Sequence, residues 1–323
     1  MSASNQPADA TQVARGSGIA TFMGLPHTRD ISGVDAAIVG IPSDTGGTPG
    51  SRSAPRVLRD VSSLLRPVHA HHNIAPGAHL RVVDYGDVPV IPGALLDTYA
   101  EMERVLAPFH AAGVVPIGIG GDHSVTLGEL RAAARHHGPV ALLQFDAHTD
   151  TYDEYYGGKI RYNSGTMFRR GVEEGVIDAQ HSMMVGLRGT VYSTHDYQDA
   201  RDLGFSTRTM DDIVELGLPQ IVQDIRACVA DRPLFLTFDV DSLDPSVAPG
   251  TGTLECGGLT MREAQTILRK LAGLHVVGCD VVEVNPPLDP TRTTAAAGAT
   301  LVFEFLALLA LARRGNDVAR QPN

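Results

Sequence analysis

The chain has little cysteine and no tryptophan. Its 323 residues include three cysteines, Cys228, Cys256 and Cys279, which are scattered and form no Cys-x-x-Cys pair. An odd, dispersed set argues against a disulfide framework and favours a reducing compartment, so we expect a cytoplasmic protein. The absence of tryptophan excludes no reaction mechanism.

The chain also lacks a block of basic residues. Its 26 lysines and arginines stand against 37 aspartates and glutamates, which gives a formal net charge of −11 at pH 7. This balance argues against binding to nucleic acid or to an anionic membrane surface.

Long uninterrupted apolar runs are missing as well. The longest stretch, residues 295–312, contains Thr300 and Glu304 and has a helical pattern. We therefore expect a helix of the protein core and not a membrane span. The first residues have neither the basic start nor the apolar centre of a signal peptide.

No linker rich in proline, serine or glycine divides the chain between residues 31 and 314. Residues 1–18 are small and polar, and we expect them to form a flexible N-terminal arm. Hydrophobic residues make up 43% of the chain, which is enough for a large buried core. We therefore expect residues 19–323 to form a single domain.

Apolar runs that are typical of strands alternate with segments of helical periodicity. The expected strands are residues 35–41, 80–84, 114–119, 140–145, 182–185, 234–238 and 275–280. The expected helices are residues 54–65, 96–112, 126–136, 219–230 and 260–274. This alternation predicts an α/β fold in which helices cover both faces of a parallel sheet.

Three of the expected strands end in potential metal ligands. The segments concerned are Gly-Gly-Asp-His-Ser (120–124), Asp-Ala-His-Thr-Asp (146–150) and Phe-Asp-Val-Asp (238–241). They present His123, Asp146, His148, Asp150, Asp239 and Asp241. The carboxyl ends of parallel strands meet at one edge of a sheet, where ligands bind in open α/β folds. Two divalent cations would balance the four aspartates, so the pattern predicts a two-metal hydrolytic centre.

Each motif alone has another interpretation. Gly-Gly-Asp-His also fits a phosphate-binding loop or a plain turn, and Asp-x-His-x-Asp fits a hydrogen-bonded polar turn. Asp-x-Asp occurs in nucleotide-sugar and Mg²⁺ sites. In an extended segment, however, residues two apart share one face, so each motif can direct its side chains at one point. The three motifs together favour the metal centre.

The donor types indicate which metal is expected. Hard carboxylates with some imidazole suit Mn²⁺ and also permit Ni²⁺, Co²⁺ or Fe²⁺. A zinc site usually has fewer ligands and more nitrogen or sulfur. Two ions about 3.5–4 Å apart can share a water and lower its pKa toward neutrality.

Glu283 follows a further strand and adds a carboxylate to this edge. A carboxylate pairs well with a planar guanidinium, so Glu283 is a candidate for binding a cationic substrate. The alternative is a structural salt bridge near the end of the sheet.

Together these segments resemble the ureohydrolase family of arginase, agmatinase and guanidinobutyrase. The signature segments are GGDHS (120–124), FDAHTD (145–150), FDVDSLDPSVAPGTGT (238–253) and EVNPP (283–287). Residues 50–56 also resemble the early Arg-Pro-Gly loop of the family. The resemblance extends from residue 18 to the C-terminal helix.

The resemblance implies a three-layer αβα arginase-like fold with a central, mostly parallel sheet of about eight strands. It implies two Mn²⁺ ions, with Ni²⁺ as the main alternative, and a homo-oligomer, hexamer or trimer. One ion would be held by His123, Asp146, Asp150 and Asp239, and the other by His148, Asp146, Asp239 and Asp241. Residues 19–323 would be a single ureohydrolase catalytic domain.

The implied reaction hydrolyses a guanidino compound to urea and an amine. Glu283 would hold the guanidinium group over a bridging hydroxide. Asp150 would pass the hydroxide proton to the departing amine nitrogen. The catalytic residues are therefore expected to be Asp150 and Glu283.

One departure from the family concerns the pocket. The family usually has a histidine at the position of Ser164, after Asn163, and this histidine is a proposed proton shuttle or substrate contact. We therefore predict a reshaped pocket in which Asn163, Ser164 and Glu283 contact the substrate. A pocket role for Cys256, and for Arg161, Arg169 and Arg170 as a carboxylate clamp, stays open. A group of four histidines, His69, His71, His72 and His79, is expected to form a solvated loop, with pocket lining as the alternative.

The expected substrate is a small cationic guanidino compound similar to agmatine or guanidinobutyrate. One alternative is hydrolysis of guanidine, an alkylguanidine or a biguanide such as metformin with nickel. Zinc deacetylases share the fold but use fewer metal ligands. A non-enzymatic alternative is a partner-dependent subunit that works with a paralogous subunit.

Overall fold

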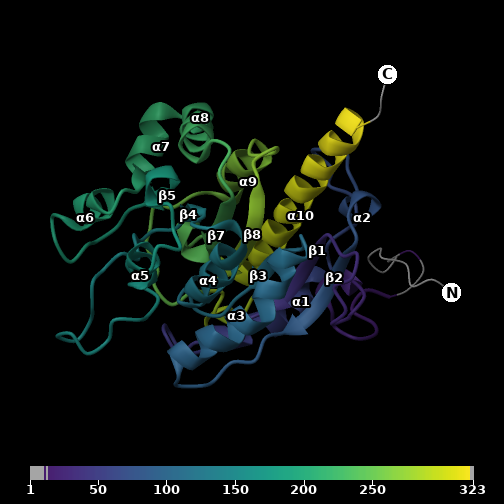
Figure 1. Cartoon of the computed structure of the whole chain (residues 1–323), viewed down its shortest axis with the longest axis horizontal. Coiled ribbons are helices and arrows are strands. Elements are labelled where there is room, and N and C mark those ends of the chain that lie inside the picture. Colours follow the sequence, from purple (N-terminus) through teal and green to yellow (C-terminus); the bar gives the residue numbers. More distant parts are fainter. Residues whose placement is uncertain (1–10, 12–13, 321–323) are drawn as a thin grey trace.

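A computed structural model describes residue 11 and residues 14–320 of the chain. Most of the expected N-terminal arm, namely residues 1–10 and 12–13, lies outside the described residues. Figure 1 shows a central sheet with helices packed around it and α10 extending from the middle of the molecule to one end.

The sheet has eight strands within the described part of the chain, in the order β2-β1-β3-β8-β7-β4-β5-β6. Every neighbouring pair is parallel. The strands are β1 (Ala36–Gly40), β2 (Val82–Asp87), β3 (Val115–Ile119), β4 (Ala141–Phe145), β5 (Met183–Leu187), β6 (Ser206–Thr209), β7 (Leu234–Asp239) and β8 (Val276–Val282). The predicted parallel sheet of about eight strands is confirmed.

Helices connect the strands. They are α1 (Ala54–Ser62), α2 (Pro76–His79), α3 (Leu95–Ala111), α4 (Val125–His137), α5 (Met167–Glu173), α6 (Asp196–Asp202), α7 (Met210–Leu216), α8 (Leu218–Val229), α9 (Met261–Arg269) and α10 (Thr293–Arg320). Both α7 and α9 begin with a capping box. The threonine before the helix accepts a hydrogen bond from the backbone N–H three residues later, and the acidic side chain of that later residue accepts the threonine's backbone N–H. Such caps satisfy backbone groups that a helix cannot pair internally.

The two faces of the sheet form two apolar layers. Alternate strand residues point to opposite faces, so Ile38 joins one layer while Val39 joins the other. The first layer includes residues of α1, α8, α9 and α10, and the second includes residues of α3, α4 and α5. Each fully buried leucine or phenylalanine contributes about 1.5–3 kcal/mol. This arrangement is the predicted αβα sandwich.

The segment Thr293–Gly315 of α10 is long and apolar enough to cross a membrane, judged by length and composition. In the structure, 67% of its most apolar window is buried, and α10 contacts α1, α2, α9 and β8. It is therefore part of the core, as its sequence pattern predicted.

Several short elements were not predicted. These are the strand β6 and the helices α2, α5, α6 and α7. Ser206–Thr209 has the sequence Ser-Thr-Arg-Thr and pairs only with β5 at the edge of the sheet. A polar edge strand has no apolar run by which to recognise it.

The solvated-loop interpretation of the histidine group is wrong for His69. This side chain is 4% exposed, and its Nε2 lies 2.8 Å from Oε2 of Glu304 on α10. Its ring stacks on that of His72, with centroids 4.9 Å apart. The loop is thus anchored to the C-terminal helix through His69.

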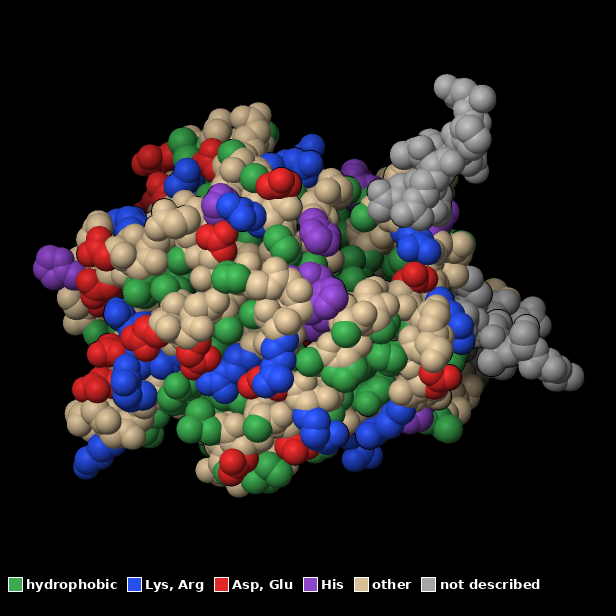
Figure 2. Space-filling view, viewed as in Figure 1, with side chains coloured by type: hydrophobic (Ala, Val, Ile, Leu, Met, Phe, Trp, Pro, Cys, Tyr) green, Lys and Arg blue, Asp and Glu red, His purple; other side chains and the backbone are tan. Residues whose placement is uncertain are grey.

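Figure 2 shows lysine and arginine side chains interspersed with aspartate and glutamate on one face of the molecule.

Candidate metal centre

Four adjacent strands bring the expected site residues to one edge of the sheet. In the sheet order, β8 lies between β3 and β7, and β4 follows β7. His123 follows β3, Asp146 follows β4, Asp239 ends β7, and Glu283 follows β8. All six expected metal ligands and Glu283 are therefore delivered by neighbouring strands. All except His148 are buried.

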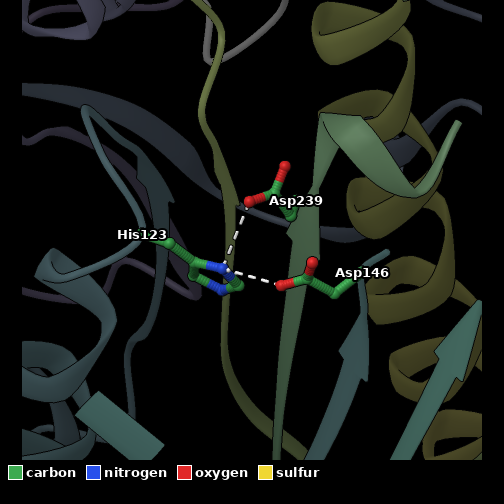
Figure 3. A group of neighbouring side chains, drawn as sticks. All are labelled: His123, Asp146 and Asp239. Carbon is green, nitrogen blue, oxygen red and sulfur yellow. Dashed lines mark ion pairs between the residues drawn. The ribbon is translucent and has the colours of Figure 1, made fainter. Parts of the chain in front are cut away.

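The first group of potential ligands surrounds His123. Its Nδ1 lies 3.0 Å from Asp146 Oδ2, 3.0 Å from Asp150 Oδ2 and 3.3 Å from Asp239 Oδ2. Figure 3 shows the ring facing the carboxylates of Asp146 and Asp239, which come from two different strands. Ligand atoms at one edge of an octahedral ion with bonds of about 2.1 Å are about 3.0 Å apart. The spacing therefore fits one cation at the centre of the group.

The buried Nδ1 atom of His123 makes no hydrogen bond to any described residue, although three carboxylates surround it. Its other ring nitrogen, Nε2, lies 2.8 Å from the hydroxyl of Thr237, which orients the ring. An unpartnered nitrogen that converges with carboxylate oxygens fits a metal ligand, because ligating histidines are normally held through the second nitrogen.

The second group consists of Asp146, His148 and Asp241. His148 Nδ1 lies 3.1 Å from Asp241 Oδ2 and 3.4 Å from Asp146 Oδ1. Asp146 belongs to both groups, with one oxygen toward each histidine. Asp239 lies in the first group, and its Oδ1 accepts the backbone N–H of Asp241 at 2.7 Å. The placement of Asp146 is that of a bridging ligand.

The local backbone is shaped to make this convergence possible. Asp150 and Glu283 have positive φ angles of 52° and 62°. Such conformations are costly for residues with a side chain and gather at functional sites. Gly121 is required for a different reason, since a Cβ there would overlap the carbonyl oxygen of Ser43.

Three supporting residues were not predicted from the sequence. They are Thr237, described above, Gln144, whose Nε2 donates to Asp146 Oδ2 at 2.8 Å, and Arg188. Gln144 and Thr237 are polar positions inside buried strands, which is a usable sequence signal. Arg188 directly follows β5, which ends at Leu187. The predicted strand ended at residue 185, so Arg188 was not expected at the edge of the sheet that carries the metal ligands.

The guanidinium of Arg188 is buried and donates to backbone carbonyls of two segments. Its Nη2 donates to the carbonyls of Asp241 at 2.7 Å and Glu255 at 2.6 Å. Nη2 also donates to the carbonyl of Leu243 at 3.2 Å, while Nη1 donates to the carbonyls of Gly186 and Ser242 and Nε to that of Cys256. Arg188 therefore ties the segment that carries Asp241 to the loop at 255–256, where Cys256 is exposed.

The site has strongly shifted pKa values. Burial alone would lower the pKa of His123, but its carboxylate neighbours outweigh burial and raise that pKa well above its usual range. Burial, reinforced by Asp241 and Asp146, raises the pKa of Asp239 well above its ordinary value. Burial and the charge of Asp146 raise the pKa of Asp150 to about 7.

These shifts have one physical origin. Several carboxylates share a buried space, so they take up protons unless another positive charge is close. Divalent cations supply that charge and keep the carboxylates ionised. Together with the unpartnered Nδ1 of His123, this donor set fits divalent metal ions.

Glu283 forms the adjoining wall of the site. Its Oε1 accepts the backbone N–H of His123 at 2.8 Å. Burial and the nearby Asp122 raise the pKa of Glu283 well above its ordinary value. Gly47 lies against it, since a Cβ at Gly47 would be 3.3 Å from Glu283 Oε1 and 2.5 Å from Asp122 Cβ. A cation that docks here would restore the ionised form of Glu283.

Ser164, which follows Asn163, contacts the loop that contains Gly46 and Gly47. The N–H of Ser164 donates to the carbonyl of Gly46 at 2.9 Å, and Gly46 N–H donates to Asp122 Oδ2 at 3.0 Å. The side-chain oxygen of Asn163 accepts a hydrogen bond from the N–H of Gly165 at 2.9 Å, so part of its hydrogen-bonding capacity is used within the turn.

The arginines considered as a carboxylate clamp have other partners. Arg170 is buried, and its Nη2 lies 2.6 Å from Asp153 and 3.0 Å from Glu173. Arg161 lies 3.5 Å from the same two carboxylates. Arg169 donates from Nε to the carbonyl of Thr151 at 2.7 Å. These contacts join the loop that contains Thr151, Asp153 and Arg161 to α5.

The sequence pattern of the arginase family matches residues 34–308. Relatives with curated functions include a guanidinopropionase of Pseudomonas aeruginosa, 46% identical over 307 residues that cover 94% of this chain and 96% of the relative. A guanidinobutyrase of the same species is 39% identical over 310 residues, with 94% and 97% coverage.

Solved structures agree with this similarity. Proclavaminate amidinohydrolase from Streptomyces clavuligerus superposes with a TM-score of 0.88 at 36% identity, covering 93% of this chain and 100% of that one. A hypothetical agmatinase from Burkholderia thailandensis superposes with a TM-score of 0.84 at 34% identity, covering 93% of each chain.

Proposed function

We propose that this chain, which belongs to the arginase family, is a metal-dependent amidinohydrolase that cleaves a guanidino compound to urea and an amine. The observation that carries the proposal is the pair of ligand groups that share Asp146, with the Glu283 carboxylate beside them. Two cation sites next to a carboxylate suit hydrolysis of a planar cationic substrate.

We propose two Mn²⁺ ions, with Ni²⁺ as the main alternative. His123, Asp146, Asp150 and Asp239 would hold one ion, and His148, Asp146, Asp239 and Asp241 the other. When bound, the ions would supply a water of lowered pKa and positive charge for the developing negative charge of the reaction.

The chain's own residues would then act as follows. Glu283 binds the guanidinium through its carboxylate and fixes the substrate carbon toward the two ligand groups. Asp150 takes a proton from the attacking water and passes it to the amine nitrogen as the bond between that nitrogen and the guanidinium carbon breaks. Gly47 lets the backbone pack directly against Asp122 and Glu283, because a Cβ there would lie 2.5 Å from Asp122 Cβ and 3.3 Å from Glu283 Oε1.

The proposal also includes the oligomeric state, the compartment and the domain division. We propose a homo-oligomer, hexamer or trimer, in the cytoplasm. We also keep the division into an N-terminal arm at 1–18 and one catalytic domain at 19–323.

The test is urea release by the purified protein, loaded separately with Mn²⁺ and Ni²⁺. The panel would contain agmatine, arginine, 4-guanidinobutyrate, 3-guanidinopropionate, guanidine, dimethylguanidine and metformin. We expect urea from at least one compound, and the Glu283→Gln variant should lose at least about 100-fold in kcat/KM.

Glu215→Gln is the matched control, since Glu215 is an exposed acid on α7, which follows the edge strand β6. It should keep wild-type activity. Absence of urea from every compound with either metal, despite confirmed occupancy of both sites, would refute the catalytic proposal and favour a partner-dependent subunit.

A further inference from the structure

Four histidines gather at the edge of the sheet opposite the candidate metal centre. His110 lies near the end of α3 and before β3, His136 and His137 end α4 before β4, and His275 directly precedes β8. The candidate metal centre lies beyond the other ends of β3 and β4, so a five-residue strand, about 16 Å long, separates the two places. We call these four residues the basal histidine cluster.

His137 is the centre of the basal histidine cluster. Its ring centroid lies 5.4 Å from that of His110, 4.7 Å from that of His136 and 6.3 Å from that of His275. Two imidazoles that bind one tetrahedral ion through bonds of about 2.1 Å have ring centroids about 5.2 Å apart. The rings of His110 and His137 are close to this spacing, whereas the ring of His275 lies further away.

His110 is buried without a hydrogen bond. It is 2% exposed, and neither Nδ1 nor Nε2 has a partner within the described part of the chain. Leaving both polar atoms of a buried ring unpaired costs free energy. The ring of His137 is in edge contact with this ring, at an interplanar angle of 86°. An ion held between the two rings would give His110 the partner that it lacks.

Both rings have the protonation state that a metal ligand requires. Burial, reinforced by His137 and His136, lowers the pKa of His110 to about 4. Burial, followed by the effects of His136 and His275, also lowers the pKa of His137. Near pH 7 the two imidazoles are therefore neutral, and a neutral imidazole has a nitrogen lone pair that can bind a metal.

The helix ends around the cluster favour a positive charge. His110 is in the last turn of α3, and His136 and His137 are in the last turn of α4. These two helices pack against each other, as Figure 1 shows. The carboxyl end of a helix carries a partial negative charge. Two such ends stabilise a cation at the place where their last turns meet.

The donors of the basal histidine cluster select a different metal from the carboxylate-rich centre. Imidazole nitrogens suit Zn²⁺, Ni²⁺ and Cu²⁺, and a tetrahedral site of three histidines and one water is typical of Zn²⁺. Mn²⁺ prefers carboxylate oxygens, which the candidate metal centre supplies. The cluster therefore fits a borderline divalent ion.

One ring must turn to complete the site. Among the residues that the structure describes, three donor atoms lie within 4.8 Å of one another only in the two groups of the candidate metal centre. His275 is exposed, and exposed side chains change rotamer within nanoseconds. His136 is exposed too, but it neighbours His137 on one helix, where adjacent residues face different directions. His275 is therefore the expected third ligand.

We infer that the basal histidine cluster is a separate metal site, in which His110, His137 and His275 bind a borderline divalent ion such as Zn²⁺. The ion would tie the ends of α3 and α4 to the start of β8 and would stabilise the fold without taking part in hydrolysis. The inference is independent of the proposed amidinohydrolase activity, because it needs neither the substrate nor the residues of that site.

The first experiment counts bound ions. The purified protein is dialysed against excess Mn²⁺ with low free Zn²⁺, and the total metal per chain is measured, so exchange of ions within the candidate metal centre does not change the count. We expect one more ion per chain in the wild type than in His137→Gln. His195→Gln is the matched control, since His195 is exposed in the segment after β5, at the other edge of the sheet. Equal counts in the wild type and His137→Gln, or an equal loss in His195→Gln, would overturn the inference.

Thermal unfolding supplies the second measurement. With the candidate metal centre saturated with Mn²⁺, free Zn²⁺ at about 100 times its Kd should raise the Tm of the wild type by about 4 °C more than that of His137→Gln. His275→Gln changes an exposed side chain and so leaves the core intact, and it should weaken Zn²⁺ binding at least about tenfold. An identical rise of the Tm in the wild type and both variants would refute the site.

Discussion

Replacement of Arg188 by methionine would remove the guanidinium that ties the segment of Asp241 to the loop at 255–256. Arg188 is 9% exposed, and its donors are all directed at backbone carbonyls of these segments and of Gly186. Methionine keeps much of the volume but leaves those carbonyls without their donor.

The structure allows the magnitude to be worked out. A hydrogen bond to a charged group contributes about 1.5–3 kcal/mol, and buried carbonyls left without a donor add a desolvation cost. We therefore expect Arg188→Met to lower the free energy of unfolding by about 3–5 kcal/mol. For a chain of this size, the Tm should fall by about 4–7 °C.

The effect on metal binding should be selective. Asp241 belongs only to the second ligand group, whereas His123 belongs only to the first. Loss of a supporting residue around a metal site typically costs about 10- to 100-fold in affinity. We expect the weaker-bound ion to be lost first, so that dialysis against low free Mn²⁺ leaves about one ion per chain.

The assay is metal analysis after dialysis at several free Mn²⁺ concentrations, combined with thermal unfolding. Arg208→Met is the matched control, since Arg208 on β6 pairs with Asp224 and not with the metal loops. It should retain two ions. If Arg188→Met binds two ions with wild-type affinity, the proposed link between Arg188 and the second site is wrong.

Three further predictions concern single residues. Gly47→Ala places a methyl group 2.5 Å from Asp122 Cβ and 3.3 Å from Glu283 Oε1, so these side chains must shift and KM for the guanidino substrate should rise at least about tenfold. An unchanged KM would contradict a guanidinium position at Glu283. Ser164→His restores the residue expected at this position and should change substrate preference in the urea assay, whereas unchanged activity and specificity would count against a reshaped pocket. His110 is 2% exposed, neither ring nitrogen is hydrogen-bonded within the described part of the chain, and burial lowers its pKa to about 4. Because the unfolded state with a pKa of 6.5 binds more protons, stability should fall as the pH drops from about 6.5 to 4, by about 3 kcal/mol in all. His110→Phe should remove this part of the acid destabilisation in urea unfolding at pH 4 and pH 7, and an unchanged pH dependence would refute it.

The potential ligands could be predicted because their arrangement is local. His148 and Asp150 follow Asp146 at spacings of two and four residues, directly after a buried strand. The expected extended pleat is not what brings them together, since residues 147–148 form a bend and Asp150 has a φ of 52°. The parallel sheet was also predictable, since alternating apolar runs and helical segments allow few other arrangements.

Elements without a local pattern could not be predicted. Ser206–Thr209 is polar and becomes a strand only by pairing with β5. His69 lies in a segment rich in histidine and is buried only because Glu304, 235 residues later, lies against it. Arg188 was missed for the same reason, because its acceptors are 53–68 residues further along the chain, apart from Gly186.

The sequence by itself determined the fold class and the identity of the metal-binding candidates, because hydrophobic periodicity and ligand spacing act over a few residues. Only the tertiary structure decided how these groups meet. It placed β8 between β3 and β7, so that Glu283 lies against His123, and it brought two separate loops together where the rings of Tyr152 and Tyr192 lie 5.3 Å apart. Such contacts depend on strand order and loop packing, which arise from interactions between residues far apart in the chain.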